Sequence, residues 1–254
     1  MCSGTSFATL LFSENFNSYA DGALLTDVSP GPGWTATSGT GTNNVTVNSG
    51  AVSLTTSGQD VSKAFTTASG ISAGGSGHVY AGFDLTLSAA QTNGDYFFSF
   101  VSGSTFNGRL YAKSTAGGYL LGLQANSAGV IVYGTTVLTF NTSNHIVVDY
   151  SNVTGTLNDT VSVFIAPSTV SATAEATAIW GGSSAEVGLT SSLLRQGSSA
   201  NAPTVGKFDN LIVSTDFSEA AGISAVPEPS SVALIAGGLA MGAVVMRRRK
   251  ASSA

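Results

Sequence analysis

Short runs of β-branched and aromatic residues, bounded by Gly, Asn, Ser or Asp, recur along the chain between about Thr9 and Thr215. Each run has the length of a β-strand, and few windows show the 3.6-residue period of an amphipathic helix. A parallel sheet needs long crossover helices, and this pattern leaves no room for them. The sequence therefore predicts an all-β protein in which residues 1–217 form one antiparallel β-sandwich of the jelly-roll type.

Apolar residues occupy every second position at 79–87 and again at 161–165, so one face of each of these strands is expected to enter a core. Turns are predicted at Asn93-Gly94, at Asn107-Gly108 and at residues 116–118, because Gly and Asn accept positive φ at low cost. Residues 167–185 are the least strand-like part of this region. We expect them to form a long surface loop.

Charged residues make up only 9% of the chain, against roughly a quarter in an average soluble protein. Residues 1–246 carry five basic and fourteen acidic side chains, so negative charges exceed positive ones by nine in that part. Such a body lacks the basic surface that phosphate backbones require, and nucleic acid is excluded as a partner. Cys2 is the only cysteine, which rules out an intrachain disulfide and a zinc cluster of cysteines.

The C-terminal part differs from everything before it. Residues 218–225 are small and polar, which suits a linker, and residues 232–246 are uncharged and apolar. With the two preceding serines this run reaches 17 residues, the low end of what a bilayer-spanning helix needs. We predict a short transmembrane helix over residues 231–246, with the sandwich outside the cell because the basic cluster after the helix stays cytoplasmic. That cluster consists of Arg247, Arg248, Arg249 and Lys250.

A short motif, a short apolar helix and a terminal arginine cluster follow one another over residues 226–254. The motif is formed by Val226, Pro227, Glu228 and Pro229. Together these elements resemble the PEP-CTERM sorting signal of exopolysaccharide-producing Gram-negative bacteria. The resemblance implies that an exosortase, a membrane transpeptidase, recognises the motif, so that the helix is in the inner membrane only transiently before the body reaches the cell surface or the extracellular matrix.

The resemblance also implies an N-terminal export signal. The opening sequence "MCSGTSFATLLFSENF" has neither a basic n-region nor an apolar h-region. We therefore expect the native export signal to be missing from the sequence as given.

The body resembles concanavalin-like and laminin-G-like jelly rolls, on the strings "LLFSENFNSYADGALL" and "VGKFDNLIV". Related modules often hold a structural calcium ion through an acidic residue near the first strand and an aspartate in the last. Glu14 and Asp209 occupy comparable places, and calcium prefers carboxylate oxygens. The alternative is that Glu14 caps a turn and Asp209 bonds a backbone amide, since only two of at least six ligands can be named.

The sequence offers little for catalysis. "GISAG" at 70–74 matches the nucleophile-elbow pattern around Ser72 with His78 nearby, but that motif needs the strand-to-helix turn of an α/β hydrolase. His145 heads another strand, and the residues Asp84, Asp95 and Asp149 are single acids without a cluster. We expect a protein that is not an enzyme and has no cofactor besides the calcium ion considered above.

Trp34 and Trp180 are predicted to lie in loops, where an aromatic ring can stack on a sugar or close one end of the sandwich. The first hypothesis is therefore an exported surface or matrix protein, not an enzyme, that acts in adhesion or associates with extracellular polysaccharide. The alternative is a calcium-stabilised carbohydrate-binding module.

Overall fold

The computed structural model describes residues 9–27, 33–39, 42–65, 75–155, 157–184, 188–197 and 201–223. All of them belong to the first of two compact units, residues 1–223 and 224–254. Several features singled out in the sequence lie outside the described residues: the motif at 226–229, the helix at 231–246, the basic cluster at 247–250 and Ser72. Within the described part of the chain, no helix is long and apolar enough to cross a membrane.

The described residues form an all-β antiparallel sandwich of two sheets, which confirms the predicted fold class. The strands are β1 (Leu10–Glu14), β2 (Trp34–Ser38), β3 (Thr46–Asn48), β4 (Ala51–Leu54), β5 (Asp60–Ala64), β6 (His78–Ala89), β7 (Asp95–Ser102), β8 (Thr105–Thr115), β9 (Gly118–Gln124), β10 (Val132–Tyr133), β11 (Asn144–Ser151), β12 (Thr160–Ile165), β13 (Ala176–Ile179), β14 (Ser191–Leu194) and β15 (Thr204–Ser214). One short helix follows, α1 (Phe217–Ala220).

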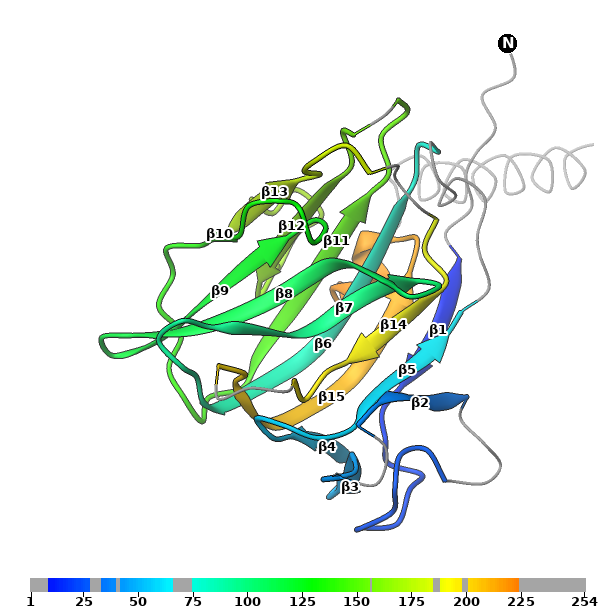
Figure 1. The fold of residues 1–254 in the computed structure, drawn as a ribbon, viewed down its shortest axis with the longest axis vertical. Coiled ribbons are helices and arrows are strands. Elements are labelled where there is room, and N and C mark those ends of the chain that lie inside the picture. The colour runs from blue at the N-terminus through cyan, green and yellow to red at the C-terminus, as the bar shows by residue number, and fades with distance from the viewer. Residues whose placement is uncertain are drawn as a thin grey trace, which may run out of the picture. The chain divides into compact units, whose positions relative to one another are not determined.

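Seven strands of the eight-stranded sheet follow the order β13-β12-β11-β6-β15-β4-β3, and the eighth, β1, pairs with β15 beside this path. The seven-stranded sheet has the order β10-β9-β8-β7-β14-β5-β2. In Figure 1 the seven-stranded sheet lies in front of the eight-stranded one. The long strand β15 carries β4 along its first half, and β1 pairs with its second half. The first and last strands of the domain are therefore neighbours.

The core lies between the sheets and follows the predicted alternation. All five apolar residues of β6 at odd positions 79–87 are fully buried. The Phe83 ring from the eight-stranded sheet lies 5.2 Å from that of Phe98 in the other sheet, and 4.5 Å from that of Phe208 on β15. Aromatic pairs at these distances add to the burial of apolar area, and the pair of Phe83 and Phe98 joins the two layers.

Two local expectations are wrong. Asn107-Gly108 is not a turn: Gly108 has φ +58° inside β8, where the register against β7 shifts, and the turn lies at Gly103 instead. A G1-type β-bulge and several tight turns both use a glycine with positive φ, so the residue pair cannot tell them apart. Residues 167–185 are not all loop, because β13 pairs there with β12. The turns at Gly94 and Gly117 do have positive φ.

The domain continues past the predicted boundary at Phe217. Asp216 caps α1 by accepting a hydrogen bond from the Ser218 amide (2.8 Å), and Ala220 is completely buried. The Phe217 ring packs edge-on against Tyr80 on the outer face of the eight-stranded sheet. The first residues of the predicted linker are thus part of the folded body, which extends to Ile223.

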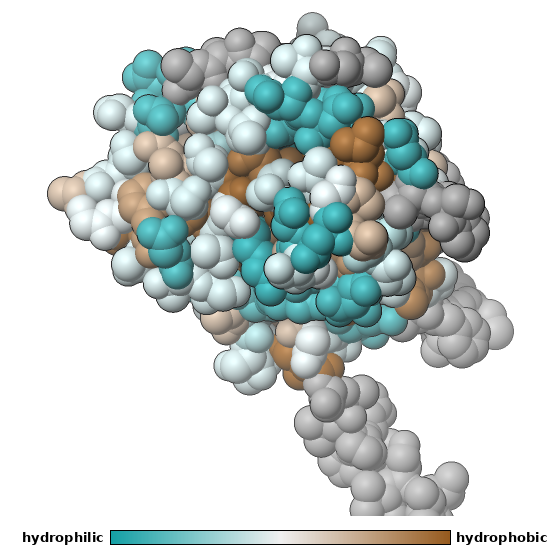
Figure 2. All heavy atoms as spheres, turned by 90° about the horizontal axis from the view of Figure 1, so that it is seen from below, coloured by the Kyte–Doolittle hydropathy of each residue, from teal (hydrophilic) through white to brown (hydrophobic). Residues whose placement is uncertain are grey.

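Seen from below, the visible surface of the described body is mostly hydrophilic or neutral, and hydrophobic residues form separate small areas (Figure 2). Separate exposed apolar residues are normal for a soluble domain. This side of the body therefore shows no broad apolar surface.

Candidate functional site

Three tyrosines lie in one row across the outer face of the seven-stranded sheet. Tyr133 on β10 pairs in register with Gly122 on β9, Gly122 pairs with Tyr111 on β8, and Tyr111 pairs with Tyr96 on β7. The rings of Tyr96 and Tyr111 are 5.5 Å apart. Gly122 makes room for the row, since a Cβ there would lie 2.5 Å from the Tyr133 ring.

Three cations lie against these rings. The guanidinium carbon of Arg195 is 4.0 Å from the centre of the Tyr96 ring and that of Arg109 is 4.9 Å from it. The Lys113 ammonium is 3.9 Å from the centre of the Tyr133 ring. Cations at these distances are attracted by the electron-rich ring faces. We call the three tyrosines, these three cations and Gln124 the tyrosine face.

Hydrogen bonds hold the polar groups of the tyrosine face in place. The Gln124 Oε1 atom accepts hydrogen bonds from the Tyr111 hydroxyl (2.7 Å) and from Arg109 (3.2 Å). Arg195 donates to the Asp95 carboxylate (2.9 Å). Arg109, Arg195 and Gln124 are thus each fixed by at least two contacts, which reduces the entropy lost when a ligand binds.

The electrostatics keep the phenols neutral and the cations charged. Burial raises the pKa of Tyr133 to about 12, and it also raises the pKa of Tyr96 and of Tyr111. Burial lowers the pKa of Arg195, but the hydrogen bond to Asp95 and the charges of neighbouring groups together outweigh burial, so the net pKa is raised. At neutral pH the phenols of this face are therefore uncharged, and its charge comes from the three cations.

The sequence alone did not single out this face. Its one local signal is the alternation of Arg109, Tyr111 and Lys113, which places these three side chains on the same side of β8. Arg195 and Tyr133 come from distant segments, and only the pairing of strands brings them together.

The predicted tryptophans lie elsewhere. Trp34 begins β2 and is 3% exposed, and Trp180 directly follows β13 and is 6% exposed. The Trp180 indole N–H donates to the Ser184 carbonyl (2.9 Å). Trp180 also lines an open hollow of about 480 Å³. Both indoles belong to the hydrophobic core. Burial of this degree favours the alternative in which both rings close the sandwich.

Glu14 and Asp209 lie on neighbouring strands, but each carboxylate is engaged by a lysine. Glu14 accepts hydrogen bonds from Lys63 (3.0 Å) and from the Tyr19 hydroxyl (2.9 Å), and Asp209 pairs with Lys207 (3.1 Å). The described residues contain no group of three or more His, Cys, Asp or Glu side chains that could hold a metal ion. This arrangement does not favour calcium at these two carboxylates.

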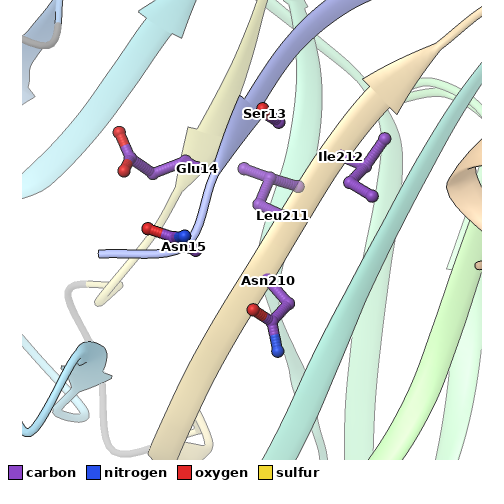
Figure 3. Close-up of a pocket in the computed structure, with 6 residues that line it drawn as sticks. All are labelled: Ser13, Glu14, Asn15, Asn210, Leu211 and Ile212. Atoms are coloured by element: carbon purple, nitrogen blue, oxygen red, sulfur yellow. The ribbon is translucent and has the colours of Figure 1, made fainter. Parts of the chain in front are cut away.

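An open hollow of about 250 Å³ is lined by residues 13–15 at the end of β1 and by residues 210–212 of β15. Figure 3 shows Asn15 and Asn210 at this hollow and the Glu14 carboxylate directed away from Ile212. The Glu14 side chain belongs to the buried ion pair, so we assign it a structural role.

The histidines have structural partners on the outer face of the eight-stranded sheet. His78 Nδ1 lies 2.9 Å from the Asp149 carboxylate, and its ring stacks on Tyr80. His145 lies 2.9 Å from Asp84 through Nδ1, and Nε2 lies 3.0 Å from the Ala220 carbonyl in α1. Ser72 lies outside the described residues, so the structure does not test the formal match at 70–74, from which no catalytic role was expected.

Comparison with known proteins supports the C-terminal prediction. Residues 225–250 match the PEP-CTERM protein-sorting motif, so the resemblance noted from residues 226–254 is confirmed. The motif marks an exported protein that an exosortase sorts to the cell surface. No curated protein is significantly similar in sequence to the chain.

Several solved structures are similar to this chain at low sequence identity. Domain 4 of the extracellular arabinanase AbnA from Geobacillus stearothermophilus, in complex with arabinotriose, is 16% identical with a TM-score of 0.48 and covers 85% of this chain and 98% of that chain. The CBM2 module of the evolved Dit of Lactobacillus casei BL23 phage J-1 gives 9% identity, a TM-score of 0.49 and coverages of 82% and 96%. A heptameric SAP-like pentraxin from Limulus polyphemus is 14% identical with a TM-score of 0.39, and the match covers 54% of this chain and 64% of the pentraxin chain. With TM-scores below 0.5, these similarities carry no information about ligands.

Proposed function

Because the sorting motif sends this chain to the cell surface, we propose that it is a non-enzymatic surface or matrix protein that holds extracellular polysaccharide on its tyrosine face. The observation that carries the proposal is the row of Tyr96, Tyr111 and Tyr133 in register across β7 to β10. The half-buried Tyr133 ring suits the apolar side of a sugar ring, and the cations held beside the row suit its polar groups. An extended row suits a polymer better than a single sugar.

The C-terminal segment acts in delivery. Pro227, Glu228 and Pro229 are the residues that the exosortase reads, and residues 231–246 hold the chain in the inner membrane until processing. The positive charges at 247–250 keep that end cytoplasmic. The body then remains at the surface or in the matrix, where polysaccharide is its natural partner.

The two halves of this proposal are tested separately. Replacing Pro227 and Glu228 by alanine is expected to leave the chain in the inner-membrane fraction, while the parent reaches the surface fraction. Replacing Ser224 by alanine, just before the matched segment 225–250, is the matched control. If the Pro227/Glu228 variant reaches the surface as the parent does, the sorting proposal is wrong.

Binding is measured with the full chain, purified in a mild detergent, by affinity electrophoresis against soluble polysaccharides of neutral and acidic type. Tyr133→Ala is expected to weaken binding about tenfold, since a stacked aromatic ring contributes about 1.4 kcal/mol. Ile179→Ala, an exposed apolar residue on β13, serves as the control. Binding to none of the polymers, or equal loss in both variants, would refute the binding proposal.

A further inference from the structure

We propose that the tyrosine face selects acidic polysaccharide, with carboxylate groups on more than one sugar, over neutral polysaccharide. This inference rests on the proposed function, because it names the ligand class of the same site. It follows from where the few basic residues lie, from how the rings are covered, and from the spacing of the cations along β8.

Positive charge is concentrated on this face. Residues 1–246 have only five basic side chains, and three of them, Arg109, Lys113 and Arg195, lie on the tyrosine face. The carboxylates that act on it are Asp95, which pairs with Arg195, and Asp60, which influences the pKa of Tyr96. The face thus keeps a net positive charge, although the chain around it is strongly acidic.

Two of the three cations are available to a ligand. Among the described residues, neither Arg109 nor Lys113 has a carboxylate within 4.0 Å, whereas Arg195 is held by Asp95 at 2.9 Å. The Arg109 bonds to Gln124 and to a backbone carbonyl fix its guanidinium without neutralising it. A fixed guanidinium presents its remaining N–H groups to a carboxylate in the geometry of a bidentate pair.

The rings themselves are partly closed to a neutral sugar. Tyr96 is 9% exposed and Tyr111 is 6% exposed, and the guanidinium groups of Arg109 and Arg195 both stack on Tyr96. A sugar that approaches these positions therefore meets N–H donors before it meets an aromatic ring. Stacking is left mainly to Tyr133, which is half-buried. This arrangement binds an anionic group more strongly than the apolar face of a sugar.

The spacing of the cations points to a polymer. Arg109 and Lys113 are four residues apart on one side of β8, which corresponds to about 13 Å along the strand at about 3.3 Å per residue. One carboxylate cannot contact both. An acidic chain with repeated carboxylates meets both at once, and the second contact then forms at high effective concentration.

The experiment compares one polymer backbone with and without its charge. The full chain in detergent is titrated with polygalacturonate and with fully methyl-esterified polygalacturonate of the same length. The acid is expected to bind at least tenfold more tightly at 50 mM NaCl. This preference is expected to shrink at 500 mM NaCl, because salt screens contacts of this kind.

Two variants each remove one positive charge, on opposite sheets of the sandwich. Lys113→Gln is expected to weaken binding of the acid about tenfold while leaving binding of the ester almost unchanged. Lys207→Gln removes the same charge from the eight-stranded sheet and serves as the matched control. Arg109→Lys keeps the charge but loses the planar fork, and an intermediate loss is expected. Unfolding midpoints of all variants are recorded alongside.

The outcomes separate the two proposals. Selective binding of the acid that is lost in Lys113→Gln and kept in Lys207→Gln supports both. Equal affinity for acid and ester overturns the acidic selectivity and leaves the polysaccharide proposal standing. Binding of neither polymer overturns the selectivity and, together with a blank polysaccharide panel, the proposed function. Equal losses in Lys113→Gln and Lys207→Gln show that overall charge, and not this face, is responsible.

Discussion

Gly82 on β6 is the point at which the C-terminal helix α1 touches the outer face of the eight-stranded sheet. A Cβ at Gly82 would lie 1.7 Å from the Ala220 carbonyl oxygen and 2.6 Å from its carbonyl carbon. Real Cβ contacts are essentially never shorter than 3.0 Å, so α1 would have to withdraw by about 1.3 Å, the difference between 3.0 and 1.7 Å. The glycine is required here by the close approach of another backbone.

The change Gly82→Ala is expected to lower the free energy of unfolding by about 2 kcal/mol. Overpacking of this kind costs about 1–3 kcal/mol. The same shift disturbs the bond of about 1 kcal/mol between His145 and the Ala220 carbonyl. The reduced freedom of the unfolded chain returns about 0.4–1 kcal/mol. For a domain of this size the melting temperature should fall by about 4–8 °C.

The assay is thermal and urea unfolding of the full chain in detergent, followed by circular dichroism. Gly206→Ala is the matched control, since a Cβ at Gly206 on β15 meets its nearest atom at 3.5 Å, an ordinary contact. That variant is expected to stay within about 0.5 kcal/mol of the parent. If Gly82→Ala and Gly206→Ala unfold at the same midpoint, the close packing of α1 on β6 is refuted.

Three further changes test other parts of the structure. The hydrogen bond to Asp149 raises the pKa of His78 above 6.5, so the folded protein holds this proton more tightly than the unfolded chain. The free energy of unfolding should therefore be highest below pH 6.5 and should fall as the pH rises through the raised pKa of His78. In urea titrations at several pH values, His78→Gln should flatten this pH dependence. An unchanged pH dependence in the variant would contradict the role of His78. Lys63→Met leaves the Glu14 carboxylate buried without its cation and should cost about 3 kcal/mol, part of which returns when Glu14→Gln is added, as a double-mutant cycle would show. Gly122→Ala should push away the β10 tyrosine ring, which its Cβ would meet at 2.5 Å, and weaken polysaccharide binding several-fold with little change in the unfolding midpoint; unchanged binding counts against a role for that ring.

Prediction from sequence succeeded where the signal is local. The alternation at 79–87 identified a strand and its buried face, and all five of its apolar residues lie in the core. It failed where one local signal serves two structures, because the positive φ of Gly108 belongs to a bulge. The indole rings of Trp34 and Trp180 were equally ambiguous, since a large ring can close a core or bind a sugar.

The amino-acid sequence by itself determined the fold class and the destination of this protein. Period-two patterning specifies strands, and the sorting motif at residues 225–250 is read from a continuous segment. The tertiary structure alone decided the candidate site and the end of the domain. Tyr96, Tyr133 and Arg195 meet because strands far apart in the chain pair in register, and α1 joins the body because Gly82 leaves space for it. Such contacts depend on long-range pairing, which no local pattern encodes.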